Sequence, residues 1–503
     1  MTNGPWIALI TVAIATSAGA QDAEREALGA VARARAIDGQ LRSIIAIDPT
    51  AVSQARAIDQ RRATGPLAGK PVLVKDNIET AGPLPTTAGS LALVNNVTGR
   101  DAPLVARMRA ANMVIFGKAN LSEWANIRSN DSISGWSAVG GQTRNPFALD
   151  RNTCGSSSGS GAAVAAGIVD LAIGTETDGS ITCPAAINGI VGMKPTVGLV
   201  SRTHVIPISS SQDTPGPMTR TVRQAAQLLS VIAGSDRADP ATREADKRKS
   251  DYAATLDANS LVGARIGVMR FASGFGTNPS FNAALAVLKA RGATLIEIDK
   301  FDRSAIGGNE FTVLLTEFKV GLNEYLASTP ATVRTRTLAD VIAFNKANAA
   351  TEMPLFGQET FERAEKTKGL SDPAYLKARR LSLAAAGTNG IDKMMREHRL
   401  DALVGPTMPA SWKIDAVHGD QISGGGAGSL AAVAGYPHLT VPMGQVKGLP
   451  VGLSFIGGKW QDARILSLGF AYEQARGPLP GPSFWRSIEE SPDVAPFLEP
   501  ARR

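Results

Sequence analysis

Histidine and cysteine are scarce in this sequence. Only four of its 503 residues are His and two are Cys, and Cys154 and Cys183 are too far apart for a C-x-x-C motif. A metal centre or a dithiol redox site therefore has little support, because these residues are common ligands of transition metals. Charged residues make up only 19% of the chain, and the net charge of +7 includes no basic cluster. This composition argues against a nucleic-acid-binding protein.

Long apolar runs are equally rare. Residues 6–20 form one, which ends in Ala18-Gly19-Ala20 and is followed by a polar stretch from Gln21. We therefore expect residues 1–20 to be the signal peptide of an exported, periplasmic or secreted protein, although no Lys or Arg precedes the run. A misplaced start codon or a buried N-terminal helix is the alternative. No other run reaches the length of a transmembrane helix, so we expect no membrane span in the mature chain.

The most informative stretch is Cys154–Pro195. It begins with a serine-rich loop, continues with small residues over 159–167 that are typical of a helix packed on a sheet, and includes an apolar strand over 171–175. Ten helical residues advance about 15 Å, and about five strand residues cover the same distance back. Ser156 and Ser180 are therefore expected to meet at the carboxyl edge of the sheet, where active sites of open α/β folds lie.

A lysine is expected beside the two serines. Residues 69–78 contain an apolar strand that reaches Lys75. Neighbouring strand residues point to opposite faces, so Asp76 should point away from this lysine. Helices are expected over 23–47 and 50–62, and the alternation of helices with strands favours an α/β sheet.

Lys75, Ser156 and Ser180 resemble the Ser–cisSer–Lys triad of the amidase signature family. The resemblance covers nearly the whole mature chain. Its further motifs, in the family's order, are TAGS at 87–90, GKANLSE at 117–123, NP at 145–146, GMKP at 192–195, GPM at 216–218, GPT at 405–407 and AGYP at 434–437. Within the family, residues 175–186 and 201–220 are most similar to the bacterial peptide amidases, which deamidate peptide C-termini.

The resemblance implies a mechanism without a cofactor. Neutral Lys75 would accept a proton from Ser156, which would accept one from the nucleophile Ser180. It also implies a cis peptide bond before Ser156 and an oxyanion hole in the turn Thr177-Asp178-Gly179-Ser180. Burial would have to lower the pKa of Lys75 from about 10.4 to about 7.5.

The implied fold is the α/β amidase signature fold, a large mixed sheet sandwiched between helices, over residues 21–503. Residues 250–400 match the family least and are rich in helical patterns, including an amphipathic segment at 313–326. We interpret this interval as a helical cap over the site, where substrate preference is usually set. An ordinary outer layer of helices is the alternative.

A different serine hydrolase motif overlaps the first serine loop. Residues 155–159 match G-x-S-x-G with Ser157 as nucleophile, and His398, His418 or His438 could complete a Ser–Asp–His order. That motif requires an apolar strand before it, and residues 151–154 do not form one.

His204 and the two cysteines allow two interpretations each. His204 either lines the substrate channel or lies in a loop near it. Free buried thiols are the default expectation for Cys154 and Cys183. A disulfide is the alternative, if the serine loops meet in an exported protein.

One departure from the family bears on the substrate. Many members carry an arginine two or three residues after the nucleophile, in some of them as a carboxylate clamp, but Thr182 and Cys183 occupy these positions here. This favours a neutral substrate over one that carries a carboxylate. We expect a small amide or an amidated peptide whose C-terminal carboxamide is hydrolysed with release of ammonia. A broad aryl- or acyl-amidase and an amidotransferase-type subunit are the alternatives.

Overall fold

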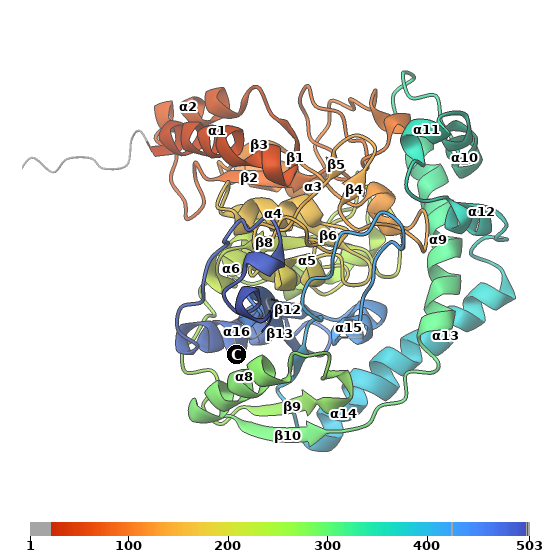
Figure 1. Ribbon diagram of the computed structural model, residues 1–503. Coiled ribbons are helices and arrows are strands. Elements are labelled where there is room, and N and C mark those ends of the chain that lie inside the picture. Colours follow the sequence, from red (N-terminus) through yellow and green to blue (C-terminus); the bar gives the residue numbers. More distant parts are fainter. Residues whose placement is uncertain (1–21, 424–425, 499, 501–503) are drawn as a thin grey trace, which may run out of the picture.

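A single large sheet forms the centre of the molecule. The computed structural model describes residues 22–423, 426–498 and 500, so the expected signal peptide lies outside the described residues. Eleven strands of the described chain are arranged in the order β1-β3-β2-β6-β8-β7-β12-β13-β11-β9-β10 (Figure 1). Their bounds are β1 (Ile44–Ile47), β2 (Pro71–Lys75), β3 (Val114–Ala119), β6 (Leu171–Glu176), β7 (Val191–Lys194), β8 (Thr214–Thr219), β9 (Arg265–Met269), β10 (Thr294–Ile298), β11 (Ala402–Pro406), β12 (His438–Val446) and β13 (Leu449–Ile456). A separate hairpin pairs β4 (Trp136–Ser137) with β5 (Gly141–Gln142).

The sheet is mixed. β2 runs parallel to β3 and to β6, and β9 runs parallel to β10 and to β11. Between these parallel groups, β8, β7, β12 and β13 pair with their neighbours in antiparallel fashion. This architecture confirms the predicted α/β fold class.

Helices cover both faces of the sheet. Their bounds are α1 (Asp22–Leu41), α2 (Ala51–Gln60), α3 (Pro103–Ala110), α4 (Ser158–Ala165), α5 (Thr182–Ile187), α6 (Val222–Ile232), α7 (Ala245–Arg248), α8 (Asn278–Ala290), α9 (Gly307–Ala327), α10 (Leu338–Ala347), α11 (Ala349–Glu352), α12 (Glu359–Glu365), α13 (Pro373–Ala386), α14 (Asp392–His398), α15 (Gly428–Ala434) and α16 (Asp462–Ala475). In β2, Val72 and Val74 pack with residues of α3 and α6, whereas Leu73 packs with residues of α1, α2 and α4. Successive side chains of the strand point to opposite faces of the sheet, so each face has its own hydrophobic core.

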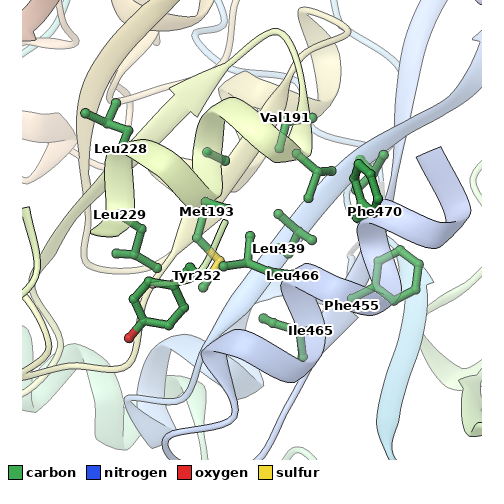
Figure 2. Packing of buried hydrophobic residues seen from close by; sticks show 14 of the residues in the cluster. Val191, Met193, Leu228, Leu229, Tyr252, Leu439, Phe455, Ile465, Leu466 and Phe470 are labelled. Carbon is green, nitrogen blue, oxygen red and sulfur yellow. The ribbon is translucent and has the colours of Figure 1, made fainter. Parts of the chain in front are cut away.

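The larger core lies under α6 and α16. Figure 2 shows the strand residues Val191, Leu439 and Phe455 beside Leu228 of α6 and Leu466 of α16, all of which are buried. Their burial fixes the central antiparallel strands against one helical layer.

The N-terminal helix is shorter than predicted. Residues 23–47 were expected to be helical, but α1 ends at Leu41 and residues 44–47 form the edge strand β1. The Asp38 carboxylate accepts hydrogen bonds from the backbone N–H of Ser43 at 2.8 Å and of Ile44 at 3.3 Å, and Arg42 has a positive φ of 52°. This local turn ends the helix, and pairing with β3 then extends the isoleucine-rich segment.

The interval 250–400 contains strands as well as helices. Residues 265–298 form β9, α8 and β10, which extend the sheet, and the helices α9–α13 follow along one side of the molecule (Figure 1). Phe361 of α12 packs edge-on against Trp124 and stacks on Phe318 of α9, in one hydrophobic cluster. The helical cap is therefore limited to α9–α13, a shorter segment than the predicted interval 250–400. Apolar contacts attach it to the rest of the chain.

A buried arginine also anchors the cap. Arg128 is fully buried, with its guanidinium 4.1 Å from the ring centroid of Phe356 and 5.5 Å from that of Trp136. It forms an ion pair with Glu123 and donates a hydrogen bond to the carbonyl oxygen of Glu352 at 2.5 Å. None of the helices in the described ranges is long and apolar enough to cross a membrane.

Candidate active site

The two serine loops meet at the carboxyl ends of β2 and β6. Ser156 precedes α4, and Ser180 lies between the end of β6 and the start of α5. The backbone N–H of Ser157 donates a hydrogen bond to the carbonyl oxygen of Ser180 at 3.1 Å. The expected helix–strand return is present as α4 and β6, which is why residues 24 positions apart become neighbours.

Lys75 joins the first serine loop. Its Nζ donates hydrogen bonds to Ser156 Oγ at 2.7 Å and to Thr175 Oγ1 at 2.9 Å, and it lies 3.3 Å from the Thr175 carbonyl oxygen. Lys75 and Ser156 are both fully buried. Burial lowers the pKa of Lys75 to about 7, although the charges of Asp213 and Glu176 oppose this shift. A substantial fraction of this lysine is therefore neutral near pH 7 and able to accept a proton.

Asp76 points away from Lys75, as the alternation of strand residues predicts. Its carboxylate lies 3.7 Å from Lys118 Nζ and accepts a hydrogen bond from the backbone N–H of Thr87 at 3.1 Å. Desolvation raises the pKa of Asp76 to about 6. The burial of Lys75 is thus not offset by its neighbour in the sequence.

The turn before Ser180 offers backbone donors. Gly179 has a φ of +81°, a conformation that glycine adopts without strain. The Glu176 carboxylate accepts from the N–H groups of Ile181 and Thr182, each at 2.8 Å, and so holds the start of α5. By contrast, the N–H groups of residues 177–180 donate to no backbone or side-chain acceptor in the described chain. They remain available to an oxygen atom bound at the turn.

The peptide bond between Gly155 and Ser156 is cis. A Cβ atom at Gly155 would lie 2.1 Å from Ser122 Oγ and 2.8 Å from Asn126 Nδ2, so a side chain does not fit there. This close packing fixes the backbone that presents Ser156 to Lys75.

Ser180 faces a cavity of about 880 Å³. Its apolar lining includes Ile127, Ile208, Ile306, Leu314, Met408 and Ile422, and its charged lining comprises Asp178, Arg303, Glu310 and Asp420. Lys75 and Ser156 are not among the lining residues, and both side chains are fully buried. The cap contributes directly, because residues 306–314 belong to the start of α9 or lie next to it.

Two acidic side chains meet at the cavity wall. Desolvation and the charge of Glu176 raise the pKa of Asp178 to about 6, and desolvation together with Asp178 raises the pKa of Glu310 to about 8. Gln212 Nε2 donates to Glu310 Oε1 at 2.9 Å and to the Thr177 carbonyl oxygen at 3.2 Å. The cap helix α9 is therefore connected to the turn that carries Ser180.

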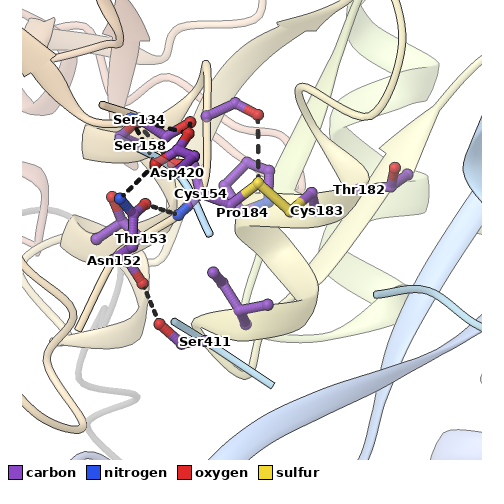
Figure 3. Close-up of a disulfide and its surroundings, with 12 residues drawn as sticks. Ser134, Asn152, Thr153, Cys154, Ser158, Thr182, Cys183, Pro184, Ser411 and Asp420 are labelled. Carbon is purple, nitrogen blue, oxygen red and sulfur yellow. Dashed lines mark hydrogen bonds between the residues drawn. A yellow bond between two sulfur atoms is a disulfide. The ribbon is translucent and has the colours of Figure 1, made fainter. Parts of the chain in front are cut away.

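Cys154 and Cys183 form a disulfide, with their Cα atoms 6.0 Å apart (Figure 3). The default expectation of two free thiols was wrong. Because the two serine loops meet, the cysteines that flank Ser156 and Ser180 come within bonding distance. The disulfide links the two loops covalently and forms part of the cavity wall.

Ser157 has a different environment from Ser180. Its hydroxyl donates to the carbonyl oxygen of Thr175 at 3.1 Å and accepts from the Thr175 N–H at 3.2 Å. Ser157 is fully buried and is not among the residues that line the cavity. These contacts give its hydroxyl a structural role at the end of β6 and argue against a nucleophile elbow.

All four histidines lie outside the cavity lining. His438 is buried in β12, where its Nε2 lies 2.7 Å from Ser454 Oγ and desolvation lowers its pKa to about 3. His418 is exposed and pairs with Asp415, and His398 lies in the last turn of α14. His204 occupies a loop, with Nδ1 3.9 Å from Glu79 Oε2. The loop interpretation of His204 therefore holds, and the channel interpretation does not.

Several site residues were not identified from the sequence. Thr175 binds Lys75, Glu176 holds α5, and Gln212 connects the turn to Glu310. Only Glu176 carries a local signal, because a carboxylate shortly before a helix start can accept its free N–H groups. The others depend on loops and helices that are distant in the sequence.

Comparison with known proteins identifies the family. The sequence profile described as Amidase matches residues 28–466. A probable amidase of Arabidopsis thaliana is 39% identical over 454 residues, which cover 86% of this chain and 83% of that protein. The A subunit of the glutamyl-tRNA(Gln) amidotransferase of Symbiobacterium thermophilum is 37% identical over 441 residues, which cover 84% and 87% of the two chains. The chain belongs to the amidase signature family and is a hydrolase that acts on amides.

Solved structures of peptide amidases are similar to this chain in both sequence and fold. The native peptide amidase of Stenotrophomonas maltophilia superposes with a TM-score of 0.87 at 48% identity, covering 92% of this chain and 95% of that one. The peptide amidase PAM in complex with the competitive inhibitor chymostatin gives the same TM-score and identity, covering 92% and 96% of the two chains. The peptide amidases are thus among this chain's structural relatives, in agreement with the resemblance found in the sequence.

Proposed function

We propose that this protein hydrolyses the C-terminal carboxamide of peptides or amino acid amides and releases ammonia. The observation that carries the proposal is the hydrogen bond of 2.7 Å from Lys75 Nζ to Ser156 Oγ. A lysine with a pKa of about 7 thereby reaches the loop that packs on the Ser180 turn. Amide bonds are poor electrophiles, and their hydrolysis needs such an activated nucleophile.

In the proposed mechanism, Ser180 is the nucleophile. Neutral Lys75 accepts the Ser156 proton while Ser156 accepts the proton of Ser180, whose oxygen attacks the amide carbonyl carbon. Ser156 then returns a proton to the departing nitrogen, and the C–N bond breaks to give ammonia and an acyl ester on Ser180. Water hydrolyses this ester by the same proton route and frees the carboxylic acid.

The turn at residues 177–180 would stabilise the tetrahedral intermediate. Its N–H groups are not used by other acceptors in the described residues, and the cavity lies directly in front of them. Preorganised donors of this kind contribute about 3–4 kcal/mol when they meet the developing oxyanion. The positive φ of Gly179 supports the tight turn that they require.

The cavity supports a neutral peptide amide as substrate. Thr182 and Cys183 stand where many relatives carry an arginine, and both line the cavity. A volume of about 880 Å³ accommodates a substrate larger than a simple acyl amide. The 48% identity to the Stenotrophomonas maltophilia peptide amidase agrees with this assignment.

An assay of released ammonia tests the proposal. The purified protein is incubated with amidated dipeptides, amino acid amides, simple aliphatic amides and anilides, and kcat/KM is compared. We expect the highest kcat/KM with amidated peptides, and none with the same peptides carrying a free C-terminal carboxylate. Higher kcat/KM with anilides would instead identify an aryl- or acyl-amidase, the alternative that the apolar part of the lining favours.

The relationship to amidotransferase A subunits suggests a second candidate. Such a subunit would show little activity alone, whereas we expect full turnover from the isolated chain. The discriminating measurement is the ammonia assay on the purified single polypeptide. Activity that required a second protein would overturn the assignment as an independent hydrolase.

We also propose that the protein is exported and begins near Gln21 in its mature form. The Cys154–Cys183 disulfide supports this, because disulfides persist mainly in oxidising compartments. Mass spectrometry of the periplasmic or secreted fraction should find residues 1–20 missing. A cytosolic protein that retains Trp6 would contradict this proposal.

A further inference from the structure

Asp213 contacts the turn that leads to Ser180. Its Oδ1 accepts a hydrogen bond from Thr177 Oγ1 at 2.6 Å, and its Oδ2 accepts from the backbone N–H groups of Ile208 and Ser209, each at 2.8 Å. Desolvation by burial raises the pKa of Asp213, while these three hydrogen bonds and the charge of Arg202 oppose the shift and favour the ionised carboxylate. It therefore joins the 208–213 loop to the middle of the turn by a charge-assisted hydrogen bond.

Asp213 also lies close to the lysine. A small void of about 10 Å³ is lined by Asn77, Thr175, Thr177 and Asp213, among others, and Thr175 Oγ1 accepts a hydrogen bond from Lys75 Nζ. Asn77 Nδ2 donates a hydrogen bond to the same hydroxyl oxygen at 3.0 Å. The buried Asn77 Oδ1 accepts no hydrogen bond from the described residues. The Asp213 carboxylate and the hydroxyl that binds Lys75 therefore border the same void.

We propose that Asp213 is a positioning residue for the amide hydrolysis proposed above: it orients the turn through Thr177 and stabilises the protonated form of Lys75. This inference rests on the proposed function, since it assigns a role within the same site. The carboxylate touches neither Lys75 nor the substrate cavity directly. It acts through Thr177 on the geometry of the turn and through its charge on the lysine.

The charges around Lys75 give the direction of the effect. Desolvation lowers the lysine pKa, and the negative charges of Asp213 and Glu176 raise it. Arg202 also lines the void, but Asp239 binds its guanidinium at 2.6 Å and 2.9 Å. Asp76 and Lys118 form an ion pair with each other at 3.7 Å and point away from Ser156. Asp213 is thus an anion that stabilises the ammonium formed when Lys75 accepts a proton.

The Asp213→Asn variant tests the charge. Only neutral Lys75 accepts a proton, so kcat/KM falls below the lysine pKa. Without the Asp213 charge this pKa is lower, and the acid limb of the kcat/KM profile should move to lower pH by about one unit. The maximal kcat should also fall by about tenfold to a hundredfold, because the turn loses its fixed acceptor and the ammonium loses a counter-charge. Asp213→Ser removes the same charge and replaces the asparagine variant if that variant does not fold.

Thr177→Val separates the two roles. It removes the hydroxyl that binds Asp213 and keeps the carboxylate, so kcat should fall while the acid limb stays at the wild-type pH.

Asp462→Asn is the matched control. Asp462 also accepts from a threonine hydroxyl at 2.6 Å and a backbone N–H at 2.8 Å, both of Thr196, but it is not among the groups that shift the Lys75 pKa. In Asp462→Asn, the acid limb of the kcat/KM profile should therefore stay at the wild-type pH.

The outcomes distinguish this inference from the proposed function. An acid limb that stays in place in folded Asp213→Asn and Asp213→Ser would overturn the role of Asp213 and leave the Lys75 mechanism intact. A limb that moves equally in Asp462→Asn would also overturn it, because the shift would then be nonspecific. If Lys75→Ala instead retains the wild-type acid limb and rate, the Lys75 mechanism fails, and if the wild type releases no ammonia from amidated peptides, the proposed function itself fails. The pH dependence of labelling by a serine-reactive phosphonate provides a second readout that does not require turnover.

Discussion

Cys154 and Cys183 are bonded across the two loops that contain Ser156 and Ser180. One cysteine lies two residues before the first serine, and the other lies three residues after the second. Figure 3 shows the bond beside the polar contacts of Asn152, whose carbonyl oxygen accepts from Ser411 and whose amide donates to Asp420. The segment before Ser156 is thereby fixed by a covalent bond and by a hydrogen-bonded network.

Removing the disulfide should lower stability. For a cross-link between residues 29 apart, we expect Cys154→Ser/Cys183→Ser to reduce the free energy of unfolding by about 3–4 kcal/mol. Denaturant titration under oxidising conditions measures this change. The wild-type protein, unfolded without reductant, should release no reactive thiol in a colorimetric titration. Two titratable thiols would show that the cysteines are free.

Ser180, and not Ser157, should react with serine-directed reagents. We expect Ser180→Ala to abolish both turnover and labelling by a phosphonate, because Ser180 alone of the two lines the cavity. Ser157→Ala should still be labelled but should lose about 1–2 kcal/mol of stability, since it removes two hydrogen bonds to Thr175. Labelling that survives in Ser180→Ala and disappears in Ser157→Ala would favour the nucleophile elbow instead.

Local patterns were sufficient to predict the centre of the site. The small residues of α4 and the apolar run of β6 determine an out-and-back path, and this path alone brings the two serine loops together. The strand that ends at Lys75 is equally local. These elements depend on short-range periodicity and on packing against one sheet, which a single sequence records well.

Contacts between distant segments could not be predicted in this way. Asp213 and Glu310 reach the turn from a loop and from the cap helix, and nothing in their own neighbourhoods indicates the partner. The disulfide was only an alternative, because its formation depends on the final distance between two loops. The strand β1 was assigned to a helix because its pairing partner β3 lies about 70 residues further on.

Lys75 should control the acid limb of the pH profile. Its pKa of about 7 predicts that kcat/KM falls below about pH 7, as the lysine becomes protonated and loses its capacity to accept a proton. Lys75→Ala should lower the rate by at least a hundredfold to ten-thousandfold while the circular dichroism spectrum is retained. Gln substitutions of His204, His398, His418 and His438 should leave the limb in place. Loss of the limb in one of these variants would assign the base to a histidine.

Glu310 should control substrate binding at alkaline pH. Near pH 7 the Glu310 carboxyl is protonated and its neighbour Asp178 is ionised, since their pKa values are raised to about 8 and about 6. Above about pH 8 both become negative, and the repulsion between them pushes the start of α9 away from the turn that carries Asp178. We therefore expect KM for an amidated peptide to rise between pH 8 and 9.5 in the wild type. Glu310→Gln stays neutral and should keep a flat KM over this range, as steady-state kinetics in one buffer series would measure.

Glu365→Gln changes a cap glutamate that does not line the cavity and serves as the control, with the wild-type rise retained. An equal rise of KM in Glu310→Gln would mean that the alkaline effect originates elsewhere in the cavity.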